Sequence, residues 1–410
     1  MMQDRLLLVT HVPLKSVSGA LSIDDQTAEG LMRWSENFES VAYAGIALPA
    51  SDSLLISSTK WVPIADLPCA DRLDVFAMPN AYRILKFFSE YKAGRARLSE
   101  KIAGSRYLCF TLGALVGDWA ALAGLEAIKQ RRKYAVWFDR VEHEVIRSDL
   151  RSMPLKRRMK ETMSLPIMRS YHRYLIRQSQ VGLFQGKDCY DHYSQFTDAG
   201  HCVYDTHTKP SDFIDADGLN AKVSAVLSGE PLRICYVGRV ADMKGPFDWL
   251  NVMAYLRESG VPFKARWLGD GPLLQQMRTI VQDRNLSAHV DLAGFCSDRK
   301  ITLETMKESH LFVFCHKTPE SPRCLIESLV CGTPIVGYRS AYAADLVDPD
   351  GGGEFVDVGN VKALCEKLIG LHRNRPALAQ AIAAASRSGL RFDEEKLYRE
   401  RANVIRSQVS

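Results

Sequence analysis

Short apolar runs alternate with helical patterns along the whole chain, and this alternation constrains the fold more than any other feature of the sequence. The runs are short and rich in β-branched or aromatic residues, which is typical of buried parallel strands. The first half contains RLLLVT, YLCFTLG, KYAVWFD and VGLFQG, and the second half contains RICYVGR, FKARWLG, HVDLAG, LFVFC and PIVGY. Because strands that alternate with helices form parallel βαβ units, the sequence predicts an α/β protein with two Rossmann-like domains.

The length of 410 residues also favours two domains, because a single hydrophobic core seldom extends over so long a chain. The polar stretch DADGLNAKVSAVLSGEP, near residues 215–231, is the predicted junction. We therefore expect an N-terminal domain over residues 1–220 and a C-terminal domain over residues 221–388. Residues 389–410 carry a charged amphipathic pattern, which predicts a C-terminal helix that packs back toward the N-terminal domain.

The composition excludes several classes of protein. With 46% hydrophobic and 25% charged residues, the chain is typical of a soluble globular protein. The most apolar segment is interrupted by Asp118 and the first residues are polar, so we expect no transmembrane span and no signal peptide. Ten cysteines occur without CxxC or Cys/His metal spacing, which indicates reduced thiols, a cytoplasmic protein and no zinc site.

A basic segment lies in the middle of the chain. Residues 147–177 contain nine Lys or Arg and two Asp or Glu, so this segment carries +7 while the whole chain carries +5. Met, Leu, Ile and Tyr are interleaved with these charges at helical spacing, which favours contact with an anionic membrane surface. The alternative is a solvated helix face. Nucleic-acid binding is not expected, because no recognition motif accompanies the charge.

Ligands of open α/β sheets bind beyond the carboxyl ends of the strands, and the second half carries candidate residues at these ends. In YVGRVADMKGPFDWL, Arg239 follows a strand and Lys244 precedes a helix. A cation beside a helix N-terminus opposes the helix dipole, unless an anion such as a diphosphate sits there and binds both cations and amide groups. The alternative is two surface cations in a loop.

Two further strand ends follow in the second half. In HVDLAGFCSD, the ring of Phe295 and the backbone groups up to Ser297 form a possible binding site for a nucleobase, and simple packing is the alternative. In WLGDGP, turn geometry accounts for the glycines.

The stretch TPESPRCLIE places one carboxylate before a helix and another inside it. Pro322 suits the first turn of that helix, Ser321 suits the capping position, and Gly332 is expected to end it. Glu327 lies four residues after Arg323, so an ion pair on the helix surface is one interpretation. Glu320 lies in the preceding loop, where a carboxylate would accept hydrogen bonds from sugar hydroxyls.

The order and spacing of these motifs, over about residues 232–370, resemble the donor domain of the family-4 retaining glycosyltransferases with the GT-B fold. The resemblance implies two Rossmann-like domains that face each other across a cleft. Over the first half the resemblance is only architectural.

The resemblance also implies a role for each matching residue. Arg239 and Lys244 would hold the diphosphate of a nucleotide-sugar, Glu327 the ribose hydroxyls, and Glu320 the hydroxyls of the donor sugar. The backbone N–H groups after Glu320, at Arg323, Cys324 and Leu325, would reach the sugar and phosphate. Phe295 to Ser297 would hold the base, and Gly19, in Ser18-Gly19-Ala20, would approach the donor phosphates.

The chain departs from the family pattern at the paired glutamates. Six residues lie between Glu320 and Glu327, one fewer than in the pattern, and Ser-Pro-Arg replaces the glycine-containing triplet after the first of them. Arg323 adds a positive group there, which favours either a negatively charged donor sugar or a role on the helix surface.

The first half is expected to supply the acceptor site. The strand KYAVWFD ends at Asp139, at the position where the resemblance implies a histidine near the reacting carbon, and His143 follows one turn later. Asp139 and His143 are therefore candidate catalytic residues together with Glu320, Asp139 by orienting the acceptor hydroxyl or accepting its proton. Alternatively, Asp139 caps the next helix and His143 is a surface histidine.

The resemblance implies a retaining glycosyltransferase that moves a sugar from a UDP- or GDP-sugar to a hydroxyl of a lipid-linked saccharide, glycolipid or polysaccharide. It would need no metal and no cofactor, since Arg239, Lys244 and helix N-termini can neutralise the departing diphosphate. We expect it in the cytoplasm, at the inner face of the membrane. The alternatives are a GT-B protein that binds nucleotide-sugar without turnover, and a GT-B hydrolase or epimerase acting on one.

Overall fold

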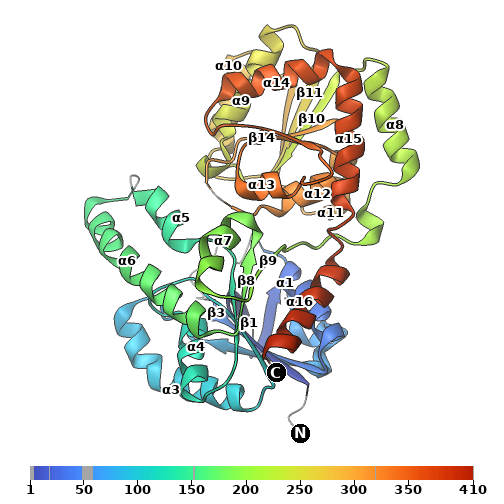
Figure 1. The fold of residues 1–410 in the computed structure, drawn as a ribbon. Helices are drawn as coiled ribbons and strands as arrows, with labels where there is room; N and C mark the ends of the chain where they lie inside the picture. Colours follow the sequence, from blue (N-terminus) through green and yellow to red (C-terminus); the bar gives the residue numbers. More distant parts are fainter. Residues whose placement is uncertain (1–3, 18, 49–58, 151–152, 319, 410) are drawn as a thin grey trace. The chain divides into compact units, whose positions relative to one another are not determined.

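The computed structural model describes residues 4–17, 19–48, 59–150, 153–318 and 320–409. The chain divides into two compact units (Figure 1). The first unit comprises residues up to His207 together with residues from Glu395 onward, and the second unit comprises Thr208–Glu394.

The first unit is built on a nine-stranded sheet. Its parallel part has the strand order β5-β3-β1-β6-β7-β8-β9, and β2 and β4 extend it as antiparallel strands. The strands are β1 (Arg5–Val17), β2 (Ala20–Asp24), β3 (Ser40–Ala47), β4 (Trp61–Pro63), β5 (Leu73–Met78), β6 (Tyr107–Thr111), β7 (Ala135–Phe138), β8 (Val181–Gln185) and β9 (Gly200–Val203). The four apolar runs of the first half are thus confirmed as strands.

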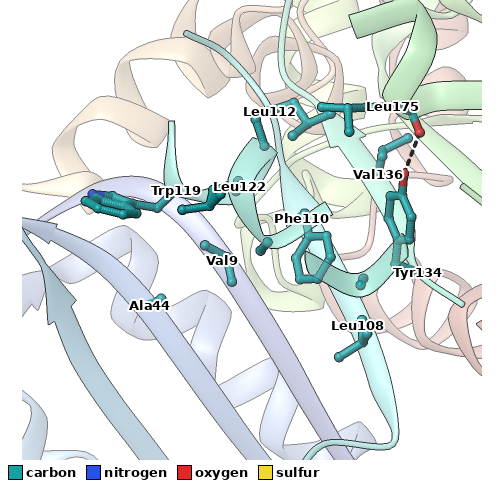
Figure 2. Packing of buried hydrophobic residues seen from close by; sticks show 14 of the residues in the cluster. Val9, Ala44, Leu108, Phe110, Leu112, Trp119, Leu122, Tyr134, Val136 and Leu175 are labelled. Atoms are coloured by element: carbon teal, nitrogen blue, oxygen red, sulfur yellow. Dashed lines mark hydrogen bonds between the residues drawn. The ribbon is translucent and has the colours of Figure 1, made fainter. Parts of the chain in front are cut away.

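Alternating side chains of β1 supply both cores of the first unit, because successive residues of a strand point to opposite faces of the sheet. Leu7 and Val9 belong to one hydrophobic cluster, and Leu6 and Leu8 to the other. Figure 2 shows the first cluster, in which the Tyr134 hydroxyl donates to the carbonyl of Leu175 at 2.8 Å. The helices are α1 (Asp25–Asn37), α3 (Ile84–Ala103), α4 (Trp119–Lys129), α5 (Glu142–Asp149), α6 (Leu155–Gln178), α7 (Gly186–Tyr193) and α16 (Glu394–Val409).

The C-terminal helix α16 packs into the first unit, as the sequence predicted. Tyr398, Ala402 and Ile405 are buried in the second of the two clusters. The Tyr398 ring meets the Trp34 ring edge-on, with centroids 5.2 Å apart. The last helix therefore completes a core whose strands begin at the other end of the sequence.

The second unit contains a six-stranded, fully parallel sheet with the order β12-β11-β10-β13-β14-β15. The strands are β10 (Leu232–Val237), β11 (Phe263–Leu268), β12 (Val290–Gly294), β13 (Leu311–Phe314), β14 (Ile335–Tyr338) and β15 (Gly353–Val356). The helices are α8 (Ala216–Leu227), α9 (Pro246–Glu258), α10 (Leu274–Asp283), α11 (Arg299–Glu308), α12 (Arg323–Val330), α13 (Ala341–Asp345), α14 (Val361–Arg373) and α15 (Arg375–Gly389). The five predicted strands of this half are confirmed, and β15 is additional.

The predicted junction differs from the structure. The two units meet in the chain between His207 and Thr208, whereas most of residues 215–231 forms helix α8 of the second unit. The side chain of Asp215 caps α8 by accepting from the N–H of Gly218 at 2.7 Å. Most polar residues of this stretch therefore lie on the outer side of a helix and not in a linker, and Lys222 is the exception because it is buried.

Helix α12 begins one residue later than the sequence suggested. Pro322 occupies the capping position, its neighbour Ser321 lies outside the helix, and no side chain caps it. Gly332 follows the helix with a φ of +62°, which confirms the predicted stop.

Candidate functional site

Backbone contacts join the carboxyl ends of β10, β11 and β12 in the second unit. The N–H of Gly238 donates to the carbonyl of Leu268 at 2.9 Å, and that of Gly269 donates to the carbonyl of Gly294 at 2.8 Å. A Cβ built on Gly269 would lie 2.0 Å from the carbonyl oxygen of Gly238. Gly269 of LGDGP is therefore required by close packing of two strand ends, a reason that the turn interpretation did not include.

The loop that carries Lys244 is fixed against the chain beyond β13. It forms a short 3-10 helix, Asp242–Lys244, and then Gly245 adopts a φ of +62° before α9 begins. The N–H of Lys317 donates to the carbonyl of Met243 at 2.9 Å. A Cβ built on Gly245 would lie 2.2 Å from the carbonyl oxygen of Cys315, so only glycine fits here.

Gly245→Ala is expected to destabilise the second unit by about 2 kcal/mol more than Gly260→Ala does. Both glycines have a left-handed φ, but a Cβ on Gly260 would meet nothing within 4 Å, so the control isolates the clash with Cys315. Urea unfolding of the two variants measures the difference. Equal losses of unfolding free energy in the two variants would show that the loop moves away from β13 without a loss of stability.

Lys244 and Glu320 form an ion pair at this edge of the sheet. Both side chains are mostly buried, and the two residues come from loops that follow β10 and β13. The structure thus brings together two residues that the sequence predicted for one site. Arg239 is exposed, and its side chain makes no hydrogen bond or ion pair within the described part of the chain. Since Glu320 neutralises Lys244, Arg239 remains an uncompensated positive charge beyond β10.

Glu327 is held by an arginine that the sequence analysis missed. Arg299 Nη1 donates to Glu327 Oε1 at 2.7 Å, and Arg299 Nη2 donates to Asp212 Oδ2 at 2.9 Å. The helical spacing had suggested Arg323, and not Arg299, as the ion-pair partner of Glu327. A carboxylate has about four lone-pair sites, so Glu327 keeps acceptor capacity for a ligand while Arg299 fixes its orientation. No local signal connects these residues, because Asp212 and Arg299 lie 87 positions apart.

The remaining predicted residues of the second unit differ in exposure. Phe295 is 68% exposed beyond β12, and Ser297 follows it before α11. Leu325 is buried, and its N–H already donates to the carbonyl of Pro322 at 3.2 Å. The sequence analysis had expected this amide to bind the ligand, but its hydrogen bond is already made within the chain. Burial raises the pKa of the Cys324 thiol to about 12, so Cys324 is not a thiolate near neutral pH.

In the first unit, Asp139 follows β7 directly and lies beside His11 of β1, a strand that is separated from β7 in the sheet by β6. Its carboxylate accepts from Trp137 Nε1 at 2.7 Å, and Asp139 Oδ2 lies 3.7 Å from His11 Nε2. Both side chains are about half exposed. The capping interpretation of Asp139 is wrong, because Val141 precedes α5. His11 was missed, although it follows the run RLLLVT and the strand-end rule would have found it.

The other two predicted residues of the first unit lie in different surroundings. His143 is buried, so the surface interpretation is wrong, and its ring meets the His192 ring with centroids 4.8 Å apart. Burial lowers the pKa of His143 to about 4, so it is neutral at pH 7. Gly19 has a φ of +85° in the turn between the antiparallel strands β1 and β2, and its neighbour Ser18 lies outside the described residues.

Comparison with known proteins identifies the second unit. Residues 220–388 match the family described as "Glycosyl transferases group 1". This stretch is similar to the glycosyl transferases group 1 domain. It contains every candidate residue of the second unit that is named above except Asp212.

One similar protein is the amylovoran biosynthesis glycosyltransferase AmsK of Erwinia amylovora, which is 25% identical over 199 residues. That match covers 47% of this chain and 48% of AmsK, so the chain spans about half the length of the curated relatives it matches.

Two solved structures resemble the whole chain. HepE of Anabaena in complex with UDP has a TM-score of 0.65 and 13% identity, and the match covers 99% of this chain and 100% of HepE. WaaG, a glycosyltransferase involved in lipopolysaccharide biosynthesis, has a TM-score of 0.64 and 12% identity over 98% of this chain and 99% of WaaG. The fold is therefore GT-B, as predicted. Among the described helices, none combines the length and apolar character needed to cross a membrane.

Proposed function

We propose that this protein is a glycosyltransferase that moves a sugar from a nucleoside-diphosphate sugar to a hydroxyl of a saccharide acceptor. The observation that carries the proposal is the ion pair of Lys244 with Glu320, which lies in the group 1 domain at the edge of the sheet where Arg239 is uncompensated. A cation for phosphate and a carboxylate for hydroxyls, side by side, suit a ligand that has both groups. The similar protein AmsK is named as a glycosyltransferase of amylovoran biosynthesis.

Each residue then has a distinct task. Arg239 and Lys244 neutralise the diphosphate as it departs, and Glu320 accepts from hydroxyls of the donor sugar. Glu327, oriented by Arg299, accepts from the ribose hydroxyls, and the exposed ring of Phe295 stacks on the base. These groups supply the charge stabilisation without a metal ion. The donor is UDP- or GDP-linked, in keeping with HepE, whose structures contain UDP and UDP-glucose.

In the first unit, Asp139 and His11 are the groups proposed to orient the acceptor hydroxyl. The reaction retains the configuration of the sugar, with the leaving diphosphate taking the proton of the acceptor hydroxyl. A lipid-linked saccharide is the proposed acceptor, and the enzyme acts at the inner face of the membrane. The basic segment 147–177 supports an anionic surface as a partner.

Thermal unfolding with UDP-, GDP-, ADP- and TDP-sugars tests the donor assignment. A ligand present at about 100 times its dissociation constant should add about 2.7 kcal/mol to the unfolding free energy. We expect stabilisation by one nucleotide family, which should be lost in Arg239→Gln. It should be kept in the control Arg387→Gln, which removes another exposed arginine, from α15. No stabilisation by any of the four families would contradict the proposal. Binding without consumption would favour a non-catalytic protein, and consumption without transfer would favour a hydrolase.

A further inference from the structure

A polar pocket lies in the first unit, and none of the residues proposed above to contact donor or acceptor lines it. It has a volume of about 740 Å³ and is formed by α5, α6 and the short 3-10 helix Ser194–Phe196. Four arginines line it: Arg147, Arg169, Arg173 and Arg177. Among the described residues that line the pocket there is no carboxylate. The pocket therefore presents concentrated positive charge, and within the described part of the chain Arg147 is the one of its four arginines with a carboxylate partner, Glu144.

Three of these arginines follow one another at four-residue spacing on α6, so they lie on one face of the helix. Like charges at this spacing destabilise a helix by a small amount each, and a bound anion removes that repulsion. Arg169 and Arg177 have no acidic partner among the described residues. Arg147, from α5, is held by Glu144 at 2.8 Å.

A buried histidine provides an independent indication of a ligand. His143 is 1% exposed and lines the pocket, and neither ring nitrogen has a hydrogen-bond partner among the described residues. A neutral imidazole carries one N–H, and a buried donor without a partner costs free energy. An anionic oxygen in the pocket would accept from this donor.

A metal ion is the competing occupant. His143, Glu144 and His192 each offer a ligand atom within 4.8 Å of the others. Glu144 Oε1 lies 3.7 Å from His143 Nε2 and acts on the ring with negative charge, but Arg147 and Arg169 act on it with positive charge, which disfavours a cation at the same place. With two arginines against one carboxylate, the net charge around His143 favours an anion.

An exposed apolar stripe runs along α6 beside the pocket. Leu155, Met159, Met163 and Ile167 follow at four-residue spacing and are each between 60% and 72% exposed. Met163 is adjacent in sequence to Thr162, and Ile167 to Pro166, both of which line the pocket. An anionic group and an apolar chain that are joined in one molecule would match this arrangement.

We propose that this pocket binds the phosphate or diphosphate group of a lipid, with the apolar part of the lipid along the stripe on α6. Phosphate oxygens accept from arginine guanidinium groups in a paired geometry, which suits an arginine cluster better than it suits a lysine cluster. The identification of that lipid with the proposed lipid-linked acceptor rests on the proposed function. The proposal that the pocket binds an anionic lipid does not depend on the proposed function.

Equilibrium dialysis of the full chain with pyrophosphate, without nucleotide-sugar, tests the anion site. Arg169→Gln/Arg177→Gln should weaken binding by about tenfold or more, because two charge-assisted hydrogen-bond donors are lost. The matched control, Arg157→Gln/Arg158→Gln, removes two exposed charges from the same helix outside the pocket and should leave binding unchanged. Equal weakening in both variants, or no binding to the wild type, would overturn the proposal.

Cosedimentation with vesicles tests the lipid. We expect the wild type to bind phosphatidylcholine vesicles that contain phosphatidic acid and not those of phosphatidylcholine alone. Met159→Ser/Met163→Ser and Arg169→Gln/Arg177→Gln should each abolish this binding. Pyrophosphate binding without vesicle binding would assign the pocket to a soluble phosphate and overturn the lipid assignment.

Two further measurements separate this proposal from its competitors. Zinc binding that is lost in His143→Ala and that excludes pyrophosphate would identify a metal site and overturn the anion site. Stabilisation by nucleotide-sugar should persist in Arg169→Gln/Arg177→Gln, so a failure of the proposed donor site and a failure of this pocket are distinguishable.

Discussion

Lys244→Ala is expected to leave the fold intact and to reduce sugar transfer by about 10²- to 10³-fold, the loss typical when one charge-stabilising donor is removed from an active site. The lysine lies in a loop fixed by Gly245 and by the backbone of Lys317, so its ammonium group is held in position before the ligand arrives. Preorganised charge of this kind acts most strongly on the charge that develops as the diphosphate leaves. Initial-rate assays with the donor identified by thermal unfolding measure the loss in kcat.

A neighbouring lysine provides the matched control. Lys317 Nζ lies 3.7 Å from Asp242 and 3.8 Å from Asp248, so its charge is already directed to carboxylates. Lys317→Ala should therefore retain most of the activity. Near-normal turnover in Lys244→Ala would contradict the donor assignment.

The ion pair itself allows a sharper test. Lys244→Ala leaves the mostly buried carboxylate of Glu320 without its cation, which costs stability for a reason unrelated to catalysis. Glu320→Gln in the same chain removes that buried charge. We expect the double variant to regain stability and to remain inactive, and a return of activity would show that the effect of Lys244 was structural.

The extent to which the sequence predicted the site depends on which residues had a local signal. Arg239, Lys244 and Glu320 each follow an apolar strand, so the strand-end rule locates them from the order of residues alone. Arg299 and Asp212 act on Glu327 through tertiary contacts between segments far apart in the chain, and no spacing could reveal them.

The strands of the fold likewise divide into those that the local sequence predicts and those that depend on tertiary contacts. The strands made of continuous apolar runs, such as β10 and β13, were predicted, because fully buried parallel strands require such runs. β3 reads SVAYAGIA and β5 reads LDVFAM, so alanine, glycine and aspartate interrupt their patterns. Their burial comes from parallel pairing with each other and, for β3, with β1, which the local sequence does not encode.

The stretch assigned to the junction was misjudged because one of its polar residues is buried. Lys222 of α8 is 3% exposed, and its ammonium group donates to the carbonyls of Cys331 and Gly332 at 2.9 and 3.2 Å. It also donates to the hydroxyl of Thr333 at 2.7 Å. A lysine in a polar stretch predicts solvent exposure. Lys222 instead joins α8 to the C-terminal end of α12 by hydrogen bonds, because free carbonyls at a helix C-terminus favour a cation.

Lys222→Met is accordingly expected to lower the unfolding free energy of the second unit by about 3 kcal/mol or more. Methionine keeps the length and apolar contacts of the side chain, but the buried oxygens lose their donor, at a cost of roughly 1–3 kcal/mol for each group left unsatisfied. Lys362→Met, on the exposed face of α14, is the control and should change stability by less than about 0.5 kcal/mol. Urea unfolding followed by intrinsic fluorescence measures both, and an equal effect of the two substitutions would contradict the fastening role.

The effect of Lys222→Met should also depend on pH. Burial lowers the pKa of Lys222 to about 7, whereas an unfolded lysine titrates near pH 10.4, so between these values the unfolded chain binds more protons at this position than the folded chain. The unfolding free energy of the wild type therefore rises with pH over this window, and the gain is lost as the pH falls toward about 7. Methionine does not titrate, and all other groups are common to both proteins. The stability lost in Lys222→Met should thus be greater at pH 9 than at pH 6.5, and a constant difference would mean that the carbonyls of Cys331 and Gly332 keep Lys222 charged throughout.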